Sequence, residues 1–378
     1  MKEVVSQISC ESYDLRDVRA ALEALLLPLG GMGHFVSPGD RVLLKPNLLS
    51  AKPPDACVTT HPAIVETVAQ LVAEAGGRVV IGDSPGIGSF QKVTERSGIA
   101  AVARRVGAEL IGFDESVEVN GSGTFRRIEL ARAYWEADKI INLPKLKTHE
   151  MMTMTCAVKN LFGAVVGAGK PAWHLKAGES RELFARLLLE IYLLKPPVLN
   201  IVDAVMAMEG DGPGSGDPLH VGLLLASSSA VAVDTLAGRV AGIPPELLHV
   251  EQEARRMGLP GADPSQLDVV PSPVKERTPF RLPGGLDVKF GLPKFISSRL
   301  KRHLTAQPVA DTKLCVLCGI CRDACPPGVI TIQNSALTVD HGRCIHCWCC
   351  RELCPYHAMT AHRGVLLKLL SAVTKRLG

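Results

Sequence analysis

Eight cysteines near the C-terminus have the residue type and spacing of metal ligands. They form two runs of the pattern C-x-x-C-x-x-C-x-x-x-C-P, and the second run begins 29 positions after the first. At the same offset Arg322 corresponds to Arg351 and Asp323 to Glu352, which indicates an internal duplication. Thiolates at such spacing bind zinc or the irons of a cluster. The cysteines are Cys315, Cys318, Cys321 and Cys325 in the first run and Cys344, Cys347, Cys350 and Cys354 in the second.

The doubled run resembles the bacterial two-cluster ferredoxin module. In this arrangement three thiolates at i, i+3 and i+6 lie on one tight loop and bind three irons of a single cubane. The fourth cysteine is too far along the chain to complete that cubane, so it binds the other one. The resemblance therefore predicts two [4Fe–4S] clusters. One is expected on Cys315, Cys318, Cys321 and Cys354, and the other on Cys344, Cys347, Cys350 and Cys325.

Other uses of these cysteines fit the sequence less well. A zinc knuckle uses pairs of C-x-x-C with a longer gap and no C-P ending, and disulfides need an oxidising compartment and a small secreted fold. Cys349 lies outside the i, i+3, i+6 pattern and is predicted to be a non-ligand packed near a cluster. Between the runs, apolar residues alternate on either side of Asn334-Ser335-Ala336, which predicts a hairpin.

The composition indicates an α/β protein without a membrane span. Hydrophobic residues make up 47% of the 378 residues and aromatic residues only 4%, so the core must be mainly aliphatic, as in parallel sheets. The formal net charge is +4, and two oxidised clusters of about −2 each would nearly cancel it. Basicity is therefore no argument for nucleic-acid binding. No apolar run reaches the ~18 residues that a membrane span requires, and a cytoplasmic location is expected because clusters are inserted there.

The order of motifs predicts four segments. Residues 1–270 alternate strands and helices, which predicts an α/β domain with a mostly parallel, doubly wound sheet. Residues 271–313 are rich in proline and carry nine Lys or Arg against three Asp or Glu. They are interpreted as a solvated linker, with a docking strip for an acidic redox partner as the alternative. Residues 314–364 should form the small α+β ferredoxin-like domain, and residues 365–378 a covering helix.

Polar residues cluster after the predicted strands of the large domain. Ligands of open α/β sheets bind beyond the carboxyl ends of the strands, and Lys45 and Asp83 stand at such ends. If the stretch after Pro144 is extended, Lys145, Lys147 and His149 point to one side. This grouping predicts an anion site; the alternative is an exposed basic loop.

Short motifs in a fixed order give a second resemblance. The motifs are Lys45-Pro46-Asn47, Thr60-His61-Pro62, Gly82-Asp83-Ser84-Pro85, Pro144-Lys145-Leu146-Lys147-Thr148-His149, Lys159-Asn160-Leu161-Phe162-Gly163, Met208-Glu209-Gly210 and Val231-Ala232-Val233-Asp234. With the cysteine-rich tail, nearly the whole chain resembles the DUF362 family of iron–sulfur proteins. The resemblance supplies no substrate. It implies that Lys45, Asp83, Lys145, Lys147, His149, Lys159, Asn160, Glu209 and Asp234 share one crevice.

Three functions are consistent with these features. In the first, a redox enzyme passes electrons to or from an anionic small molecule, with Lys147 and His149 as the catalytic residues and His149 as the proton donor. Lys45, Asp83, Lys145, Lys159, Asn160, Glu209 and Asp234 are then expected to bind the substrate, and the redox partner protein is not identified. The second is a dedicated electron carrier. The third is a cluster-based sensor or scaffold without turnover.

Overall fold

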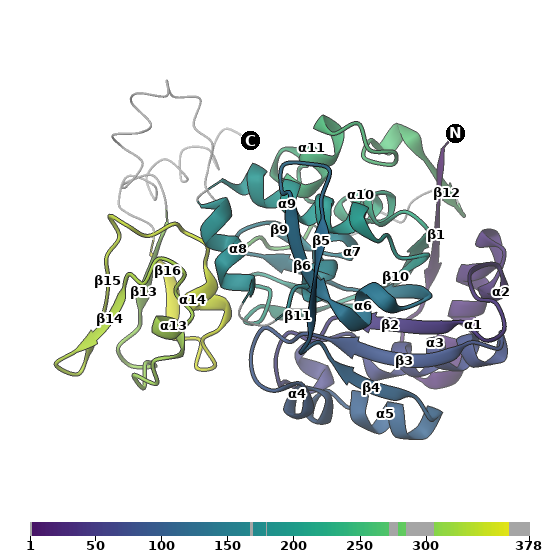
Figure 1. Ribbon diagram of the computed structural model, residues 1–378, viewed down its shortest axis with the longest axis horizontal. Coiled ribbons are helices and arrows are strands. Elements are labelled where there is room, and N and C mark those ends of the chain that lie inside the picture. The colour runs from purple at the N-terminus through teal and green to yellow at the C-terminus, as the bar shows by residue number, and fades with distance from the viewer. Residues whose placement is uncertain (1, 167–168, 179, 272–278, 285–305, 363–378) are drawn as a thin grey trace.

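The structure consists of a large α/β domain and a small C-terminal module, which lie side by side (Figure 1). The computed structural model describes residues 2–166, 169–178, 180–271, 279–284 and 306–362. The predicted covering helix at 365–378 and most of the predicted linker lie outside the described residues. The module is the yellow part of Figure 1.

Among the described residues, ten strands form one large sheet. Its strands are β1 (Glu3–Ser9), β2 (Arg41–Pro46), β3 (Arg78–Asp83), β4 (Glu109–Gly112), β7 (Lys139–Leu143), β8 (Lys145–His149), β9 (Thr153–Thr155), β10 (Leu199–Glu209), β11 (Asp217–Ser227) and β12 (Leu267–Val270). Three two-stranded sheets accompany it: β5 (Ser116–Asn120) with β6 (Arg127–Ala131), β13 (Gln307–Ala310) with β16 (Met359–His362), and β14 (Ile330–Gln333) with β15 (Ala336–Val339).

The large sheet is mostly parallel. Its strand order is β12-β1-β11-β10-β7-β2-β3-β4, and β8 and β9 extend from β10. From β10 to β4 all neighbours are parallel, whereas β11 is antiparallel to both β10 and β1. The short connection at 210–216 explains this exception, because only antiparallel strands can be joined by a tight loop. The predicted α/β fold class is confirmed.

Helices cover both faces of the large sheet. They are α1 (Leu15–Leu26), α2 (Met32–Phe35), α3 (Pro62–Glu74), α4 (Phe90–Arg96), α5 (Ile99–Val106), α6 (Arg132–Glu136), α7 (Ala157–Asn160), α8 (Gly169–Ala177), α9 (Arg181–Leu194), α10 (Ala230–Val240) and α11 (His249–Arg256), with α13 (Ile320–Asp323) and α14 (Cys349–Glu352) in the module. Short 3₁₀ turns occupy η1 (Leu27–Leu29), η2 (Pro54–Ala56), η3 (Leu161–Ala164), η4 (Pro245–Leu247) and η5 (Pro264–Gln266).

Strand β2 shows how the two hydrophobic cores arise. Side chains alternate across a strand, so Leu43 joins the cluster that contains residues of α9 and α10. Leu44 joins the other cluster, with residues of α1, α3 and α5. Because β2 is buried on both faces, its sequence is a continuous apolar run rather than an alternating one.

Helix α3 begins and ends as its sequence predicts. Pro62 occupies the first turn, where its missing N–H costs no hydrogen bond. The Nδ1 atom of His61 accepts a hydrogen bond from the backbone N–H of Ala63 at 3.2 Å and so caps the helix. Gly76 follows the helix with a φ of 88°, a left-handed conformation that suits glycine.

The stretch after Pro144 is extended, as expected. It forms β8, which is parallel to β10 and antiparallel to β9. All five of its residues are buried, which excludes the exposed basic loop. The charged side chains of this strand must therefore find partners inside the protein.

The module begins earlier along the chain than its cysteines suggest. Strand β13 lies within the segment predicted to be linker, yet it pairs with β16. Another part of that segment lies on the large domain, where the N–H of Phe280 donates to the carbonyl of Ala241 at 2.9 Å. The predicted hairpin is present as β14 and β15, and Asn334 and Ser335 form its turn with φ values of 50° and 57°.

One arginine holds the module against the large domain. Arg351 on α14 reaches Glu150 at 2.6 Å and Asp211 at 2.6 Å, and only 11% of its side chain is exposed. Glu150 follows β8 and is 1% exposed. Since an unpaired buried carboxylate is costly, this contact fixes α14 over the end of β8.

We predict that Arg351→Met weakens docking of the module. Removal of one partner from a buried ion pair costs roughly 3–5 kcal/mol, because the other charge is left without compensation. Hydrogen exchange should therefore increase in α14 and β8. The control is Arg322→Met at the matching position of the first run, where the side chain is 50% exposed and pairs with the neighbouring Asp323. Equal exchange in both variants would contradict the docking role.

Candidate functional site

The eight cysteines line two separate hollows in the module. One hollow is lined by Cys315, Cys318, Cys321 and Cys354, with Leu337 and Met359 as apolar walls. The other is lined by Cys325, Cys344, Cys347 and Cys350, with Ile330 and Trp348 as apolar walls. These are the two sets of four that the sequence predicted, including the exchange of the fourth cysteine between runs.

The backbone repeats its conformation around the two hollows. Leu317 and His346 both have positive φ, at 56° and 49°, and they are related by the 29-residue offset. The N–H of Val329 donates to Cys325 Sγ at 3.4 Å, and the N–H of Ala358 donates to Cys354 Sγ at 3.3 Å. Hydrogen bonds of this kind stabilise thiolate ligands. The duplication therefore extends from the sequence to the ligand geometry.

The hollows fit clusters better than single ions. Across the described part of the chain, no three His, Cys, Asp or Glu side chains come together closely enough to hold one metal ion. Four thiols around an apolar hollow match a cubane, whose irons lie at its corners. Cys349 lines neither hollow. Its thiol donates to Cys347, and this contact together with burial raises the pKa of Cys349 well above the usual range.

A cavity of about 270 Å³ lies where the module meets the carboxyl ends of the strands. From the large domain its charged and polar lining includes Asn47, Asp83, Ser84, Lys147, His149, Thr155, Lys159, Asn160, Lys170 and His174. From the module it includes Ala324, Cys349, Glu352 and Leu353. This position follows the general rule for open α/β sheets, and the module supplies the opposite wall.

Lys45 and Asp83 form a buried ion pair at one side of the cavity. The Lys45 Nζ lies 2.7 Å from an Asp83 oxygen, and the lysine is fully buried. Asp83 also accepts hydrogen bonds from the N–H groups of Leu48 and Ser84, both at 2.9 Å. Burial lowers the pKa of Lys45, while Asp83 opposes that shift. Gly163 is required here, because a Cβ atom would overlap both charged groups.

Lys147 lies in the cavity wall, where hydrogen bonds to amide groups hold its side chain. Its Nζ donates to Asn47 Oδ1 at 2.8 Å and to the carbonyl of Val58 at 2.7 Å. Asn47 in turn donates to Asn160 at 2.9 Å. An ammonium has three N–H donors, so one remains for a ligand. Burial, followed by the nearby charges of Lys145 and Lys159, lowers the pKa of Lys147 to about 7.

Both ring nitrogens of His149 are engaged within the protein. Nδ1 accepts from the N–H groups of Met151 and Met152 at 3.0 and 3.2 Å. Nε2 lies 3.1 Å from a Glu352 oxygen. Burial and the neighbouring Lys159 lower the pKa of His149 to about 4, so the neutral ring donates from Nε2 to Glu352. His149 thus positions the module rather than presenting a free proton.

Lys170 and His174 of α8 are cavity residues that sequence reasoning missed. The Lys170 Nζ donates to the carbonyls of Ser84 and Pro85, and burial lowers its pKa to about 8. Burial also lowers the pKa of His174 to about 3. Their i, i+4 spacing places both on one helix face, and this spacing is the feature of the sequence that could have identified them. Glu352 was missed as well, and no local pattern separates it from a surface residue.

Four residues expected in the crevice lie outside the cavity lining: Lys45, which is paired with Asp83 beside the cavity, and Lys145, Glu209 and Asp234. Lys145 pairs with Asp203 at 2.9 Å and donates to Tyr13 at 2.8 Å. Glu209 accepts the backbone N–H of Arg281 at 2.8 Å. Asp234 accepts the N–H groups of Ala157 and Val158 at 2.6 and 3.0 Å. Each has a structural partner, and Asp234 in particular caps α7.

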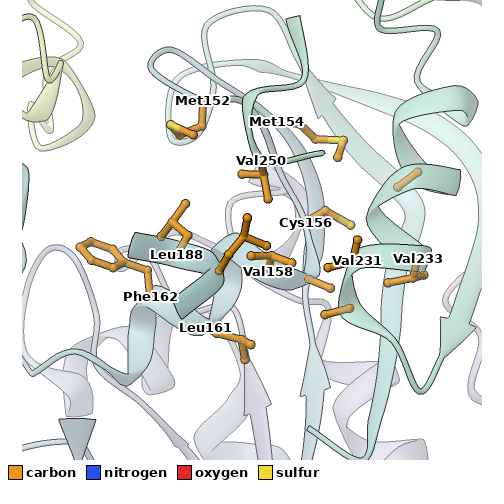
Figure 2. Packing of buried hydrophobic residues seen from close by; sticks show 14 of the residues in the cluster. Met152, Met154, Cys156, Val158, Leu161, Phe162, Leu188, Val231, Val233 and Val250 are labelled. Atoms are coloured by element: carbon orange, nitrogen blue, oxygen red, sulfur yellow. The ribbon is translucent and has the colours of Figure 1, made fainter. Parts of the chain in front are cut away.

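The segment that carries Lys159 and Asn160 packs against the hydrophobic core. Val158, Leu161 and Phe162 belong to the segment that also carries Lys159 and Asn160 (Figure 2). Figure 2 shows Phe162 and Leu188 of α9 in the same cluster. Close packing of this kind restricts side-chain motion, so the site residues between these anchors are held in place.

Two family models match parts of this chain. A family model described as "Domain of unknown function (DUF362)" matches residues 42–239, more than half of the chain. The chain belongs to the DUF362 family. A second model, described as "4Fe-4S binding domain", matches residues 308–331, which include the first cysteine run. This member of the DUF362 family is therefore an iron–sulfur protein. Within the described residues, no helix is both long and apolar enough to cross a membrane.

Two kinds of relative were found. The chain is 40% identical over 304 residues to thylakoid-associated protein sll1697 of Synechocystis sp., and the match covers 80% of this chain and 94% of that protein. It also resembles the lactate racemase apoprotein of Thermoanaerobacterium thermosaccharolyticum at 12% identity, with a TM-score of 0.42 over 64% of this chain and 58% of that one. The chain thus spans less than two thirds of the racemase, and this distant likeness carries no functional argument.

We predict that Cys325→Ser removes the cluster held mainly by the second run, whereas Cys349→Ser leaves both clusters. The unaltered protein should contain about eight irons and eight labile sulfides, and Cys325→Ser about half of each. Iron analysis after anaerobic reconstitution measures the difference. Loss of iron in the Cys349 variant, or none in the Cys325 variant, would show that the ligand assignment is wrong.

Proposed function

We propose that this DUF362 protein is a redox enzyme with two [4Fe–4S] clusters and that its substrate is an anionic small molecule bound in the cavity. The observation that carries the proposal is the shared lining of the cavity. Cys349 and Glu352 of α14 form part of it, and α14 also contains Cys350 of the second cysteine hollow. A ligand in the cavity would therefore lie against the helix that carries a cluster ligand.

The clusters would supply or accept electrons one at a time when bound. The chain's own residues would select and hold the substrate. Lys147, Lys159 and Lys170 line the cavity, whereas Asp83 is already paired with Lys45 and Glu352 interacts with His149. With its lysines protonated, the cavity has a positive balance of charge. Since buried cations without counter-charges are costly, a bound anion would lower the free energy of the site.

Lys147 is the better candidate for proton transfer in this site. His149 was expected to be the proton donor, but both of its nitrogens are engaged by the protein. Lys147 has a pKa lowered to about 7 by burial, which suits a group that must give and regain a proton near neutrality. We propose Lys147 as the proton donor at its Nζ atom and His149 as a positioning residue for Glu352.

A dedicated electron carrier is the second candidate function. Cys318 is exposed, and Leu314, Val316 and Ile320 around it are also exposed. The first cysteine site could therefore exchange electrons with a partner protein at the surface. A carrier needs no enclosed charged cavity, so the two functions differ in whether the protein retains a small molecule.

Native mass spectrometry of the anaerobically purified protein separates these functions. An enzyme of the proposed kind should retain an anionic small molecule together with the mass of its clusters. A carrier should show the clusters without a ligand and should exchange electrons rapidly with a partner protein. A protein that retains no ligand and binds no added anion would contradict the enzyme proposal.

The cytoplasm is the proposed location, because clusters are inserted there. The thylakoid-associated relative suggests an alternative in which a protein of this kind lies at a membrane surface. Cell fractionation distinguishes the two, since a surface-bound protein would be recovered with membranes and released by salt.

We predict that Lys147→Met greatly weakens anion binding in the cavity. Loss of one charge-assisted hydrogen bond should cost roughly 1.5–3 kcal/mol, which corresponds to about a 10- to 150-fold loss of affinity. Sulfate is a suitable probe, because its charge is constant across neutral pH. Iron content and unfolding should be unchanged. The control is Lys139→Met, at the other end of the sheet in β7; similar losses in both variants would contradict a specific site.

Anion affinity should also fall as the pH rises above about 7. Below the pKa of Lys147, its ammonium is already present and sulfate affinity is maximal. Above it, binding must take up a proton, so affinity falls by up to about tenfold for each pH unit. Lys170, with a pKa of about 8, should extend the decline. In titration calorimetry, Lys147→Met should not show the part of the decline that begins near pH 7. If its affinity depends on pH as in the unaltered protein, Lys147 is not the group that titrates.

A further inference from the structure

Lys159 differs from the other lysines of the cavity because no partner is present for its amine. Lys147 donates to Asn47 and Val58, and Lys170 donates to backbone carbonyls. No residue that the structure describes forms a hydrogen bond or an ion pair with the Lys159 Nζ, although this atom belongs to a residue of the cavity lining. Lys159 is partly buried, and a polar group removed from water without a partner is costly.

Burial of Lys159 favours an uncharged amine, whereas its two aromatic neighbours and Glu352 favour the ammonium. Its Nζ lies 5.6 Å from the ring centres of both Phe162 and Phe184. Burial lowers the pKa of Lys159, while the charge of Glu352 acts in the opposite direction. A desolvated lysine among apolar groups presents a larger fraction of free amine, which is the nucleophilic form.

A second unpartnered group lies in the same cavity. His174 stacks on Phe184 with ring centres 4.3 Å apart and meets Phe162 edge-on at 5.8 Å. It is only 5% exposed, and among the described residues its Nδ1 has no hydrogen-bond partner. Phe162 and Phe184 are thus neighbours of both Lys159 and His174. An imidazole can accept and return a proton during a reaction of the amine.

We propose that Lys159 binds its ligand covalently as an imine and that the ligand is a small oxo acid. This inference rests on the proposed anion-binding cavity and adds the class of ligand. The free N–H of Lys147 would hold the carboxylate, and the amine of Lys159 would meet the carbonyl group. A simple electrostatic role for Lys159 would require only its charge, whereas the imine requires its free amine.

The imine step is balanced without an oxidant. The nitrogen lone pair of Lys159 attacks the carbonyl carbon, and a C–N bond forms while the C=O electrons move to oxygen. Both amine protons are transferred to that oxygen, which leaves as water, and the C=N bond is formed. His174, whose ring is neutral because burial lowers its pKa to about 3, would relay a proton transiently from nitrogen to oxygen. Hydrolysis reverses each of these changes and returns the amine.

Reductive trapping tests the imine directly. The anaerobically purified full-length protein is treated with glyoxylate, a very small oxo acid, and sodium cyanoborohydride at neutral pH. Peptide mapping should find the adduct on Lys159, formed at least about tenfold faster than on an ordinary surface lysine, because the free-amine fraction is larger. Lys176 is the matched reference, since it lies over the Trp173 ring at 4.0 Å but is exposed.

The outcomes separate this inference from the proposed function. Lys159→Arg, which has no nucleophilic amine but can still attract an anion, should abolish the fast adduct, and Lys176→Arg should retain it. Labelling of Lys159 no faster than of Lys176, or a fast adduct that persists in Lys159→Arg, would overturn the imine. Glyoxylate held in equilibrium dialysis without an adduct would also overturn it, yet would leave the anion cavity intact. A Lys159 adduct in a protein without redox turnover would support the imine alone.

Discussion

Burial of charge at one edge of the sheet is the constraint on which the rest of the structure depends. Lys45, Lys145 and Lys147 are essentially inaccessible to solvent. A fold can place them there only if each has a partner, because an unpaired buried charge would cost more than the marginal stability of the domain. Asp83 and Asp203 compensate the first two. Among the described residues Lys147 donates to neutral oxygens, and this difference is the reason that we propose it as a binding residue.

Docking of the module completes this burial. Without α14, His149 and Glu150 at the end of β8 would face solvent on that side, and the lysines beyond them would be better hydrated. The contacts of Glu352 with His149 and of Arg351 with Glu150 join the two parts through charged groups. The lowered pKa values in the cavity are therefore properties of the docked protein. Because the module also forms a wall of the cavity, the electrostatics of the cysteine sites and of the cavity are coupled.

The sequence was informative where chemistry is local. The spacing of the cysteines was sufficient to predict the two groups of four, because three ligands of each group lie on one short loop. The alternation of strands and helices in the large domain was predicted because apolar periodicity extends over whole elements. Lys45, Asp83, Lys147, His149, Lys159 and Asn160 were expected in one crevice and all lie at or beside the cavity.

The sequence was uninformative where a partner lies far along the chain. Asp203 lies 58 positions from Lys145 in the sequence. The ion pair between them holds Lys145 outside the cavity lining. Asp234 lies 77 positions from Ala157, whose N–H group it caps. Nothing in either local sequence indicates which lysine or carboxylate will be neutralised in this way. Only the fold identifies the lysine without a partner among the described residues, and for that reason the reactivity proposed for Lys159 would be a property of the tertiary structure rather than of its motif.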